Sequence, residues 1–167
     1  MRVRELVSRC VNIIRNARYI PSVARMAYEV VEAQAEVAKH DYPAAEKRLK
    51  RLYSMGLPES VMQRSTASLL MALVSLKLGD PEAAAELVPK AVTDVSSIRA
   101  YANPVERAYL QYAGRLILEE ATAAMGRPMT LDVGVEYDDL DAGQVRSSFV
   151  DTFPVFRSRY ADAPPIH

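Results

Sequence analysis

Apolar residues recur at spacings of three and four along most of residues 1–127, which is typical of amphipathic α-helices. The pattern predicts a helix from Pro81 and helices over residues 2–18, 22–39, 43–55, 58–78 and 104–125. Pro89 removes one backbone hydrogen bond, so we expect a kink or break near Val88. The segment 58–78 has almost no polar side, and we therefore expect it to be the central helix, covered on all sides.

Short turn signals separate these segments. They are HDYP at residues 40–43, Gly56, GDP at residues 79–81 and GRP at residues 126–128. Glycine after a helix and proline in a first helical turn are typical of helix ends and starts. Short turns between long helices place neighbours antiparallel. The sequence therefore predicts an all-α fold of antiparallel helical hairpins.

The spacing of apolar residues also predicts which face of a helix points inward. Over residues 22–39 the expected inward positions are Val23, Ala27, Val30, Val31, Gln34 and Val37, and the opposite face is lined by Glu29, Glu32 and Glu36. Over residues 104–125 the expected inward positions are Val105, Tyr109, Tyr112, Leu116 and Ala123.

The last forty residues have a different character, so we divide the chain into a helical domain, 1–127, and a C-terminal arm, 128–167. Residues 130–137 (TLDVGVEY) alternate like a short strand, and residues 143–153 favour one more short helix. The tail is otherwise irregular, with apolar anchors at Phe149, Phe153, Val155, Phe156 and Tyr160. We expect this arm to pack on the same domain or on a partner.

Charge changes the picture through its distribution, because the net charge of the 167 residues is zero. Residues 1–25 carry six arginines and one glutamate, whereas the arm carries seven acidic residues and three arginines. A single cysteine, Cys10, excludes an internal disulfide. The basic N-terminus is either the first helix of the fold or resembles a mitochondrial presequence. We expect a cytoplasmic protein, with the mitochondrial matrix as the alternative.

Two turns are alike in sequence. HDYPAAEKRL (40–49) and GDPEAAAELV (79–88) each contain an aspartate, a proline, an alanine pair and an apolar residue about four positions later. The second resembles the inter-helix turn of tetratricopeptide repeats. Over residues 66–92 the family's paired small residues match Ala72 and Ala84, its next inward pair matches Val88 and Ala91, and its turn glycine matches Gly79.

The resemblance is degenerate elsewhere. The family's register on residues 22–39 buries Glu29, Glu32 and Glu36, which requires partners for three carboxylates. The turns at His40, Gly79 and Gly126 are 39 and 47 residues apart, whereas a regular array has a period of about 34. An unrelated helical bundle with two similar turns is the alternative.

The resemblance also implies a ligand groove on one face of the first helices. The matching positions here are Thr66, Leu69, Leu73, Leu76 and Lys77. A face so rich in leucine is unfavourable in water. We expect either the C-terminal arm, through Phe153 and Phe156, or a protein partner to cover it.

Candidate chemistry is sparse. The two histidines, His40 in a turn and His167 at the last position, form no metal-binding pattern, and neither a phosphate loop nor a nucleophile elbow occurs. Cys10 lies on an apolar stripe, and the His40–Asp41 pair is typical of a helix turn. Glu119 and Glu120 lack a histidine at the spacing of a di-metal site. We expect no catalytic residues, no metal and no cofactor.

Two basic surfaces remain. One comprises Arg2, Arg4, Arg9 and Arg15, and the other comprises Lys47, Arg48, Lys50 and Arg51. Such surfaces bind nucleic acid, an acidic protein or a membrane face. The favoured function is a non-catalytic protein–protein interaction module, an adaptor or an accessory subunit of a larger assembly. The alternatives are an RNA-binding subunit of a ribonucleoprotein and a small enzyme or regulator with a pocket between helices.

Overall fold

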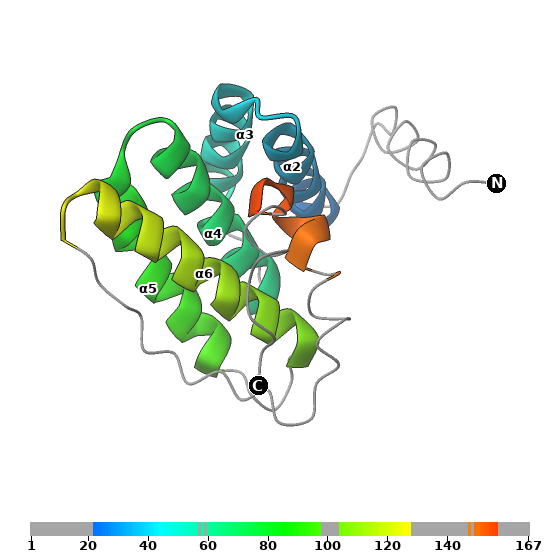
Figure 1. Cartoon of the computed structure of the whole chain (residues 1–167). Helices are drawn as coiled ribbons and strands as arrows, with labels where there is room; N and C mark the ends of the chain where they lie inside the picture. The colour runs from blue at the N-terminus through cyan, green and yellow to red at the C-terminus, as the bar shows by residue number, and fades with distance from the viewer. Residues whose placement is uncertain are drawn as a thin grey trace.

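The computed structural model describes residues 22–56, 58, 60–97, 104–127, 147 and 149–156, and its regular structure is helical (Figure 1). The elements are α2 (Ser22–Ala38), α3 (Tyr42–Ser54), α4 (Val61–Lys77), α5 (Pro81–Ser97), α6 (Pro104–Ala124) and the 3-10 helix η1 (Pro154–Phe156). The all-α prediction is confirmed. The helix expected over 2–18 and the strand expected over 130–137 lie outside the described residues.

The helices form two antiparallel hairpins, α2–α3 and α4–α5, followed by α6. Both α2 and α4 have 17 residues, and α4 begins and ends 39 positions after α2. Helix α4 packs against α2, α3, α5 and α6, which confirms its central position. Figure 1 shows α4 lying between α2 and α6. The described helices therefore pack as an all-α bundle around α4.

The same turn device ends the first helix of each hairpin. His40 has a φ of +61° after α2, and Gly79 has a φ of +90° after α4. The next residue is an aspartate whose N–H donates to the helix, from Asp41 to the Glu36 carbonyl and from Asp80 to the Ser75 carbonyl, both at 2.9 Å. Each aspartate then caps the following helix through its side chain. The interpretation of His40–Asp41 as a helix-turn device is confirmed.

Helix α5 continues without interruption from Pro81 to Ser97 with Pro89 inside it, so the chain is not broken near Val88. Pro89 is exposed, which leaves its ring on the solvent side of the helix. Val88 and Ala91 on either side of it are buried in the core.

Helix α2 is oriented differently from the expectation. Glu29 is only 4% exposed, whereas Val23 and Val31 are 59% and 50% exposed. The prediction that Val23 and Val31 point inward is therefore wrong. The prediction that the glutamates line the opposite, outer face is wrong for Glu29. The cause is α3, whose arginines attract the glutamate face of α2 toward the interior.

The described part of the C-terminal arm covers the helical layer. Phe149, Phe153 and Phe156 are at most 1% exposed and belong to the same core as Leu69 and Leu73. The ring of Phe149 meets that of Tyr112 edge-on at 5.1 Å, and Thr152 is hydrogen-bonded to Tyr109. The earlier residue of the segment thus contacts the later residue of α6, so the segment runs antiparallel to α6.

The other end of this segment, η1, packs against α2. The segment, orange to red in Figure 1, therefore connects α6 to α2 across the layer.

Candidate partner-binding site

The expected groove on α4 is largely interior. Leu69 and Leu73 are fully buried and Thr66 is 8% exposed. Phe153 and Phe156 lie in the same core cluster as the two leucines. These five side chains are therefore not on the surface of the protein in this structure.

The remaining two expected residues, Leu76 and Lys77, lie where α4 ends and border a hollow of about 360 Å³. The opposite wall comes from the last turns of α6 and consists of Glu119, Glu120, Ala123 and Ala124. Ala123 and Ala124 are the smallest side chains of this lining. We call this space the α4–α6 hollow.

Ion pairs fix the rim of the α4–α6 hollow. Lys77 Nζ lies 3.1 Å from Glu120 Oε2 across the hollow, and Arg115 Nε lies 2.8 Å from Glu119 Oε1 along α6. Each carboxylate therefore has a cation, so the rim is close to neutral overall. Leu78, the next residue beyond α4, is 44% exposed. The arrangement suits an apolar side chain in the hollow, surrounded by groups that can hydrogen-bond a partner backbone.

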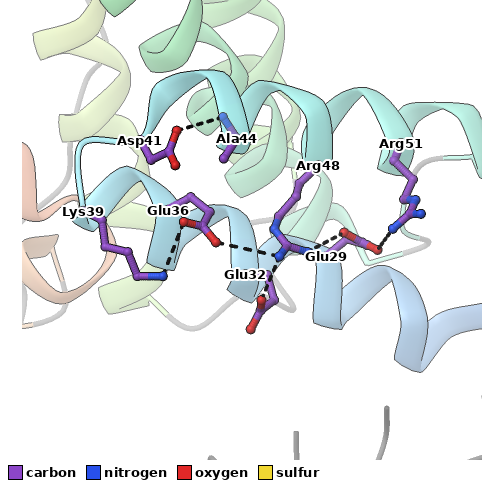
Figure 2. A network of polar contacts seen from close by, with 8 residues as sticks. All are labelled: Glu29, Glu32, Glu36, Lys39, Asp41, Ala44, Arg48 and Arg51. Carbon is purple, nitrogen blue, oxygen red and sulfur yellow. Dashed lines mark hydrogen bonds and ion pairs between the residues drawn. The ribbon is translucent and has the colours of Figure 1, made fainter. Parts of the chain in front are cut away.

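A second polar feature joins α2 to α3 (Figure 2). Arg48 of α3 lies 3.4 Å from Glu29, 3.1 Å from Glu32 and 3.7 Å from Glu36. Arg51 also reaches Glu29, at 3.3 Å. The partners that three half-buried or buried carboxylates require are therefore present. This glutamate–arginine network explains how the acidic side of α2 can face the fold.

The network changes the second basic surface. Arg48 and Arg51 are committed to α2, and Lys50 pairs with Glu46 at 2.7 Å. Lys47 is exposed and borders a hollow of about 360 Å³ together with Glu36, Ala44, Arg48 and Arg51. The glutamates thus offset the positive potential of this surface. The first basic surface, Arg2, Arg4, Arg9 and Arg15, lies outside the described residues.

Signs of acid–base or metal chemistry are limited in the described part of the chain. Burial raises the pKa of the Tyr109 hydroxyl, the hydrogen bond with Thr152 lowers it, and the nearby Glu106 carboxylate raises it. Among the described residues, no three His, Cys, Asp or Glu side chains come together as a metal site. Cys10 and His167 lie outside these residues. None of the described helices combines the length and the apolar character needed to cross a bilayer.

One feature of the site and one feature of the helix packing behind it were missed from the sequence. Ala123 was expected inward, but it is exposed at the α4–α6 hollow. Gly114 was not singled out, although α6 approaches α5 so closely there that an added Cβ would lie 2.5 Å from Val92 Cγ2. A glycine inside an apolar helical pattern is the one available signal of such an approach.

Comparisons with protein-family models, with curated proteins and with solved structures returned no match. The tetratricopeptide resemblance therefore stays a prediction from the sequence, and the site is interpreted from its own geometry.

Proposed function

We propose that this protein is a non-catalytic protein–protein interaction module, an adaptor or accessory subunit, which binds a partner chain at the α4–α6 hollow. The observation that supports this most is the uneven cover of the helical layer. Leu69 and Leu73 lie in the same core as Phe153 and Phe156, whereas Leu76 and Lys77 border the hollow beside Glu119 and Glu120.

The shape and chemistry of the hollow favour a short peptide segment as its occupant. Ala123 and Ala124 give an apolar wall without bulk, and Leu76 adds an apolar side chain from α4. The ion pair between Lys77 and Glu120 places a donor and an acceptor on the rim, where a partner backbone needs both. One anchoring side chain surrounded by polar contacts is a common organisation for the centre of an interface.

RNA binding is less well supported by the described residues. Nucleic-acid affinity depends on cations that are available to phosphates. Here Arg48, Lys50 and Arg51 have carboxylate partners, which compete with phosphate. The N-terminal arginines keep this alternative open, and a steep loss of RNA affinity with added salt is the observation that would favour it.

The test uses three tagged chains, each purified from the protein's own cells, and compares the partner proteins that co-purify with each. Wild type is compared with Ala123→Arg, which fills the hollow from an exposed position, and with Thr93→Arg, which adds the same charge at an exposed position on α5. Quantitative mass spectrometry then measures each co-purified protein.

We expect at least one stoichiometric partner that Thr93→Arg retains and that Ala123→Arg reduces at least tenfold. Circular dichroism must show equal helix content for all three chains. Equal recovery with Ala123→Arg and wild type contradicts the proposed site, and the absence of any stoichiometric partner contradicts the proposed function.

A further inference from the structure

Three phenylalanines of the C-terminal arm have the spacing of one helix face. Phe149, Phe153 and Phe156 are four and three positions apart, which corresponds to positions i, i+4 and i+7. Each of them is at most 1% exposed, whereas Asp151 between them is exposed. Residues 149–156, which we call the aromatic segment, therefore have an apolar face in the core and an opposite side that carries an exposed carboxylate.

Two backbone hydrogen bonds of the aromatic segment are formed within the segment. The N–H of Phe153 donates to the Phe149 carbonyl at 2.8 Å, and the N–H of Phe156 donates to the Phe153 carbonyl at 3.1 Å. The rings also approach one another, with centroid distances of 5.9 Å from Phe149 to Phe153 and 6.0 Å from Phe149 to Phe156. These contacts do not depend on the helices below the segment.

The aromatic segment is attached to α6 by side chains. The ring of Phe149 meets that of Tyr112 edge-on at 5.1 Å, and Thr152 forms a side-chain hydrogen bond with Tyr109. At the other end of the segment, η1 packs against α2. We call the part of α6 and α2 that these contacts define the aromatic seat (Figure 1).

This arrangement has the chemistry by which one protein binds a helix of another. In that mode the ligand keeps its backbone hydrogen bonds to itself and inserts apolar anchors at positions such as i, i+4 and i+7. Here the ligand and the surface that receives it belong to one chain. The contacts depend on the type of side chain and not on the covalent connection, so an external helix with the same anchors can form them.

We propose that the aromatic seat is a docking site for a helix of a partner protein with aromatic or large apolar residues at positions i, i+4 and i+7, and that the aromatic segment closes this site in the free protein. The covalent tether gives the segment a local concentration on the order of millimolar. A partner helix therefore needs contacts beyond the three anchors to replace it. The segment of a second copy offers only the same anchors and must also offset the loss of translational freedom on association, so a different protein is the occupant that fits.

The aromatic seat is separate from the α4–α6 hollow. Tyr109 and Tyr112 lie in the first half of α6, whereas the hollow is lined by the last turns of the same helix. The test of the seat therefore does not depend on the proposed function of the hollow.

A labelled synthetic peptide of residues 146–158 provides the probe, and its binding to the full chain is measured by fluorescence anisotropy. Three chains are compared. They are wild type, Phe153→Ser, which removes the central anchor of the tethered segment, and Asp151→Ser, which changes an exposed position of the same segment. A second peptide with alanine in place of its three phenylalanines is the control ligand. Circular dichroism records the helix content of each chain.

We expect the phenylalanine peptide to bind Phe153→Ser at least tenfold more tightly than wild type or Asp151→Ser, because the central anchor no longer holds the tethered segment on the seat. The alanine peptide should bind none of the three chains. Equal affinity for the three chains would show that the segment does not close the seat and would overturn the proposal. A folded Phe153→Ser that does not bind the peptide, or a Phe153→Ser that loses its helix signal, would show that the segment is a fixed part of the core and would also overturn it.

Hydrogen exchange of wild type tests the same proposal without a substitution. A segment that leaves its seat exposes its amides in a local opening, whereas a fixed part of the core opens only with the whole fold. The amides of Phe153 and Phe156 should therefore exchange at least tenfold faster than that of Leu73 in α4. Equal exchange rates contradict the proposal. Dimers that increase with concentration in size-exclusion chromatography would assign the seat to a second copy and overturn the choice of a different protein.

Discussion

The close approach of α6 to α5 makes Gly114→Ala the most informative single substitution in the fold. The new Cβ would lie 2.5 Å from Val92 Cγ2, 3.4 Å from Val88 Cγ1 and 3.5 Å from Leu69 Cδ2. A separation of 2.5 Å is well inside van der Waals contact, and the χ1 angle of valine is stiff in a helix. Relief therefore requires the two helices to move apart.

Two effects of opposite sign determine the magnitude. Alanine in place of glycine inside a helix favours folding by about 1 kcal/mol. Overpacking a well-filled core costs about 1–3 kcal/mol, and contact with a stiff side chain favours the upper end. The expected net result is a loss of about 2 kcal/mol in the free energy of unfolding, which corresponds to a decrease in melting temperature of roughly 4–8 °C for a chain of this size.

Urea unfolding of Gly114→Ala, Val92→Ala and the double variant tests this explanation. Val92→Ala alone should cost about 2 kcal/mol because it removes two methyl groups from a site that is 4% exposed. In the double variant the alanine methyl at position 114 occupies part of the space that Val92 vacates. We expect a total loss near 2 kcal/mol rather than 4, a coupling within the range of contacting pairs.

Two outcomes would contradict a steric clash between the new methyl group and Val92. A stabilised Gly114→Ala variant would show that the propensity gain dominates and that α6 does not approach α5 this closely. Additive losses in the double variant would show that the two residues do not touch. Thr93→Ala, at an exposed position on α5, serves as the control and should change stability by less than about 0.5 kcal/mol.

Three further predictions concern polar groups. In a urea titration, Arg48→Ala should lower the free energy of unfolding by about 2 kcal/mol, because Glu29 is then buried with one cation, Arg51, instead of two. Lys50→Ala, which removes an exposed ion pair, should cost less than about 0.5 kcal/mol. Burial raises the pKa of Tyr109 above its unfolded value of 10.0, so the stability that this residue contributes should be intact below pH 10 and decrease as the pH rises above it. In unfolding experiments between pH 9 and 11, Tyr109→Phe should show a smaller decrease in stability than wild type. Ser65→Ala should raise the melting temperature, because its buried hydroxyl has no hydrogen-bond partner among the described residues and its removal should gain about 1 kcal/mol. An unchanged or lower melting temperature would contradict this assignment.

The positions of the helices were predictable from local physics. The spacing of apolar residues located α2 to α6 within a few positions, and glycine, proline and aspartate located their ends. Helix formation and capping depend on neighbours in the chain, so a single sequence contains the information. Pro89 is the exception, because the helix continues through it despite the missing hydrogen bond. Val88 and Ala91, on either side of Pro89, are buried in the core.

Orientation was less predictable because it depends on the partner helix. The sequence shows a glutamate stripe on α2 and a basic stripe on α3, but not that they face each other. Arg48 forms contacts with three glutamates that are 12 to 19 residues earlier in the chain. Once these stripes meet, Glu29 is buried and Val31 turns outward.

The α4–α6 hollow was partly predictable. Leu76 and Lys77 followed from the resemblance to tetratricopeptide repeats, but Thr66, Leu69 and Leu73 from the same set are interior. The far wall comes from residues more than 40 positions later. Small residues such as Ala123 and Ala124 do not by themselves predict an open space, because a hollow depends on how the neighbouring helices pack.

We propose that this chain works as a subunit that binds another protein. Native mass spectrometry of the tagged protein, purified gently from its own cells, tests this most directly. We expect a defined complex that contains the chain and at least one other protein in fixed stoichiometry. A single species at the 18.5 kDa mass of the chain would contradict it.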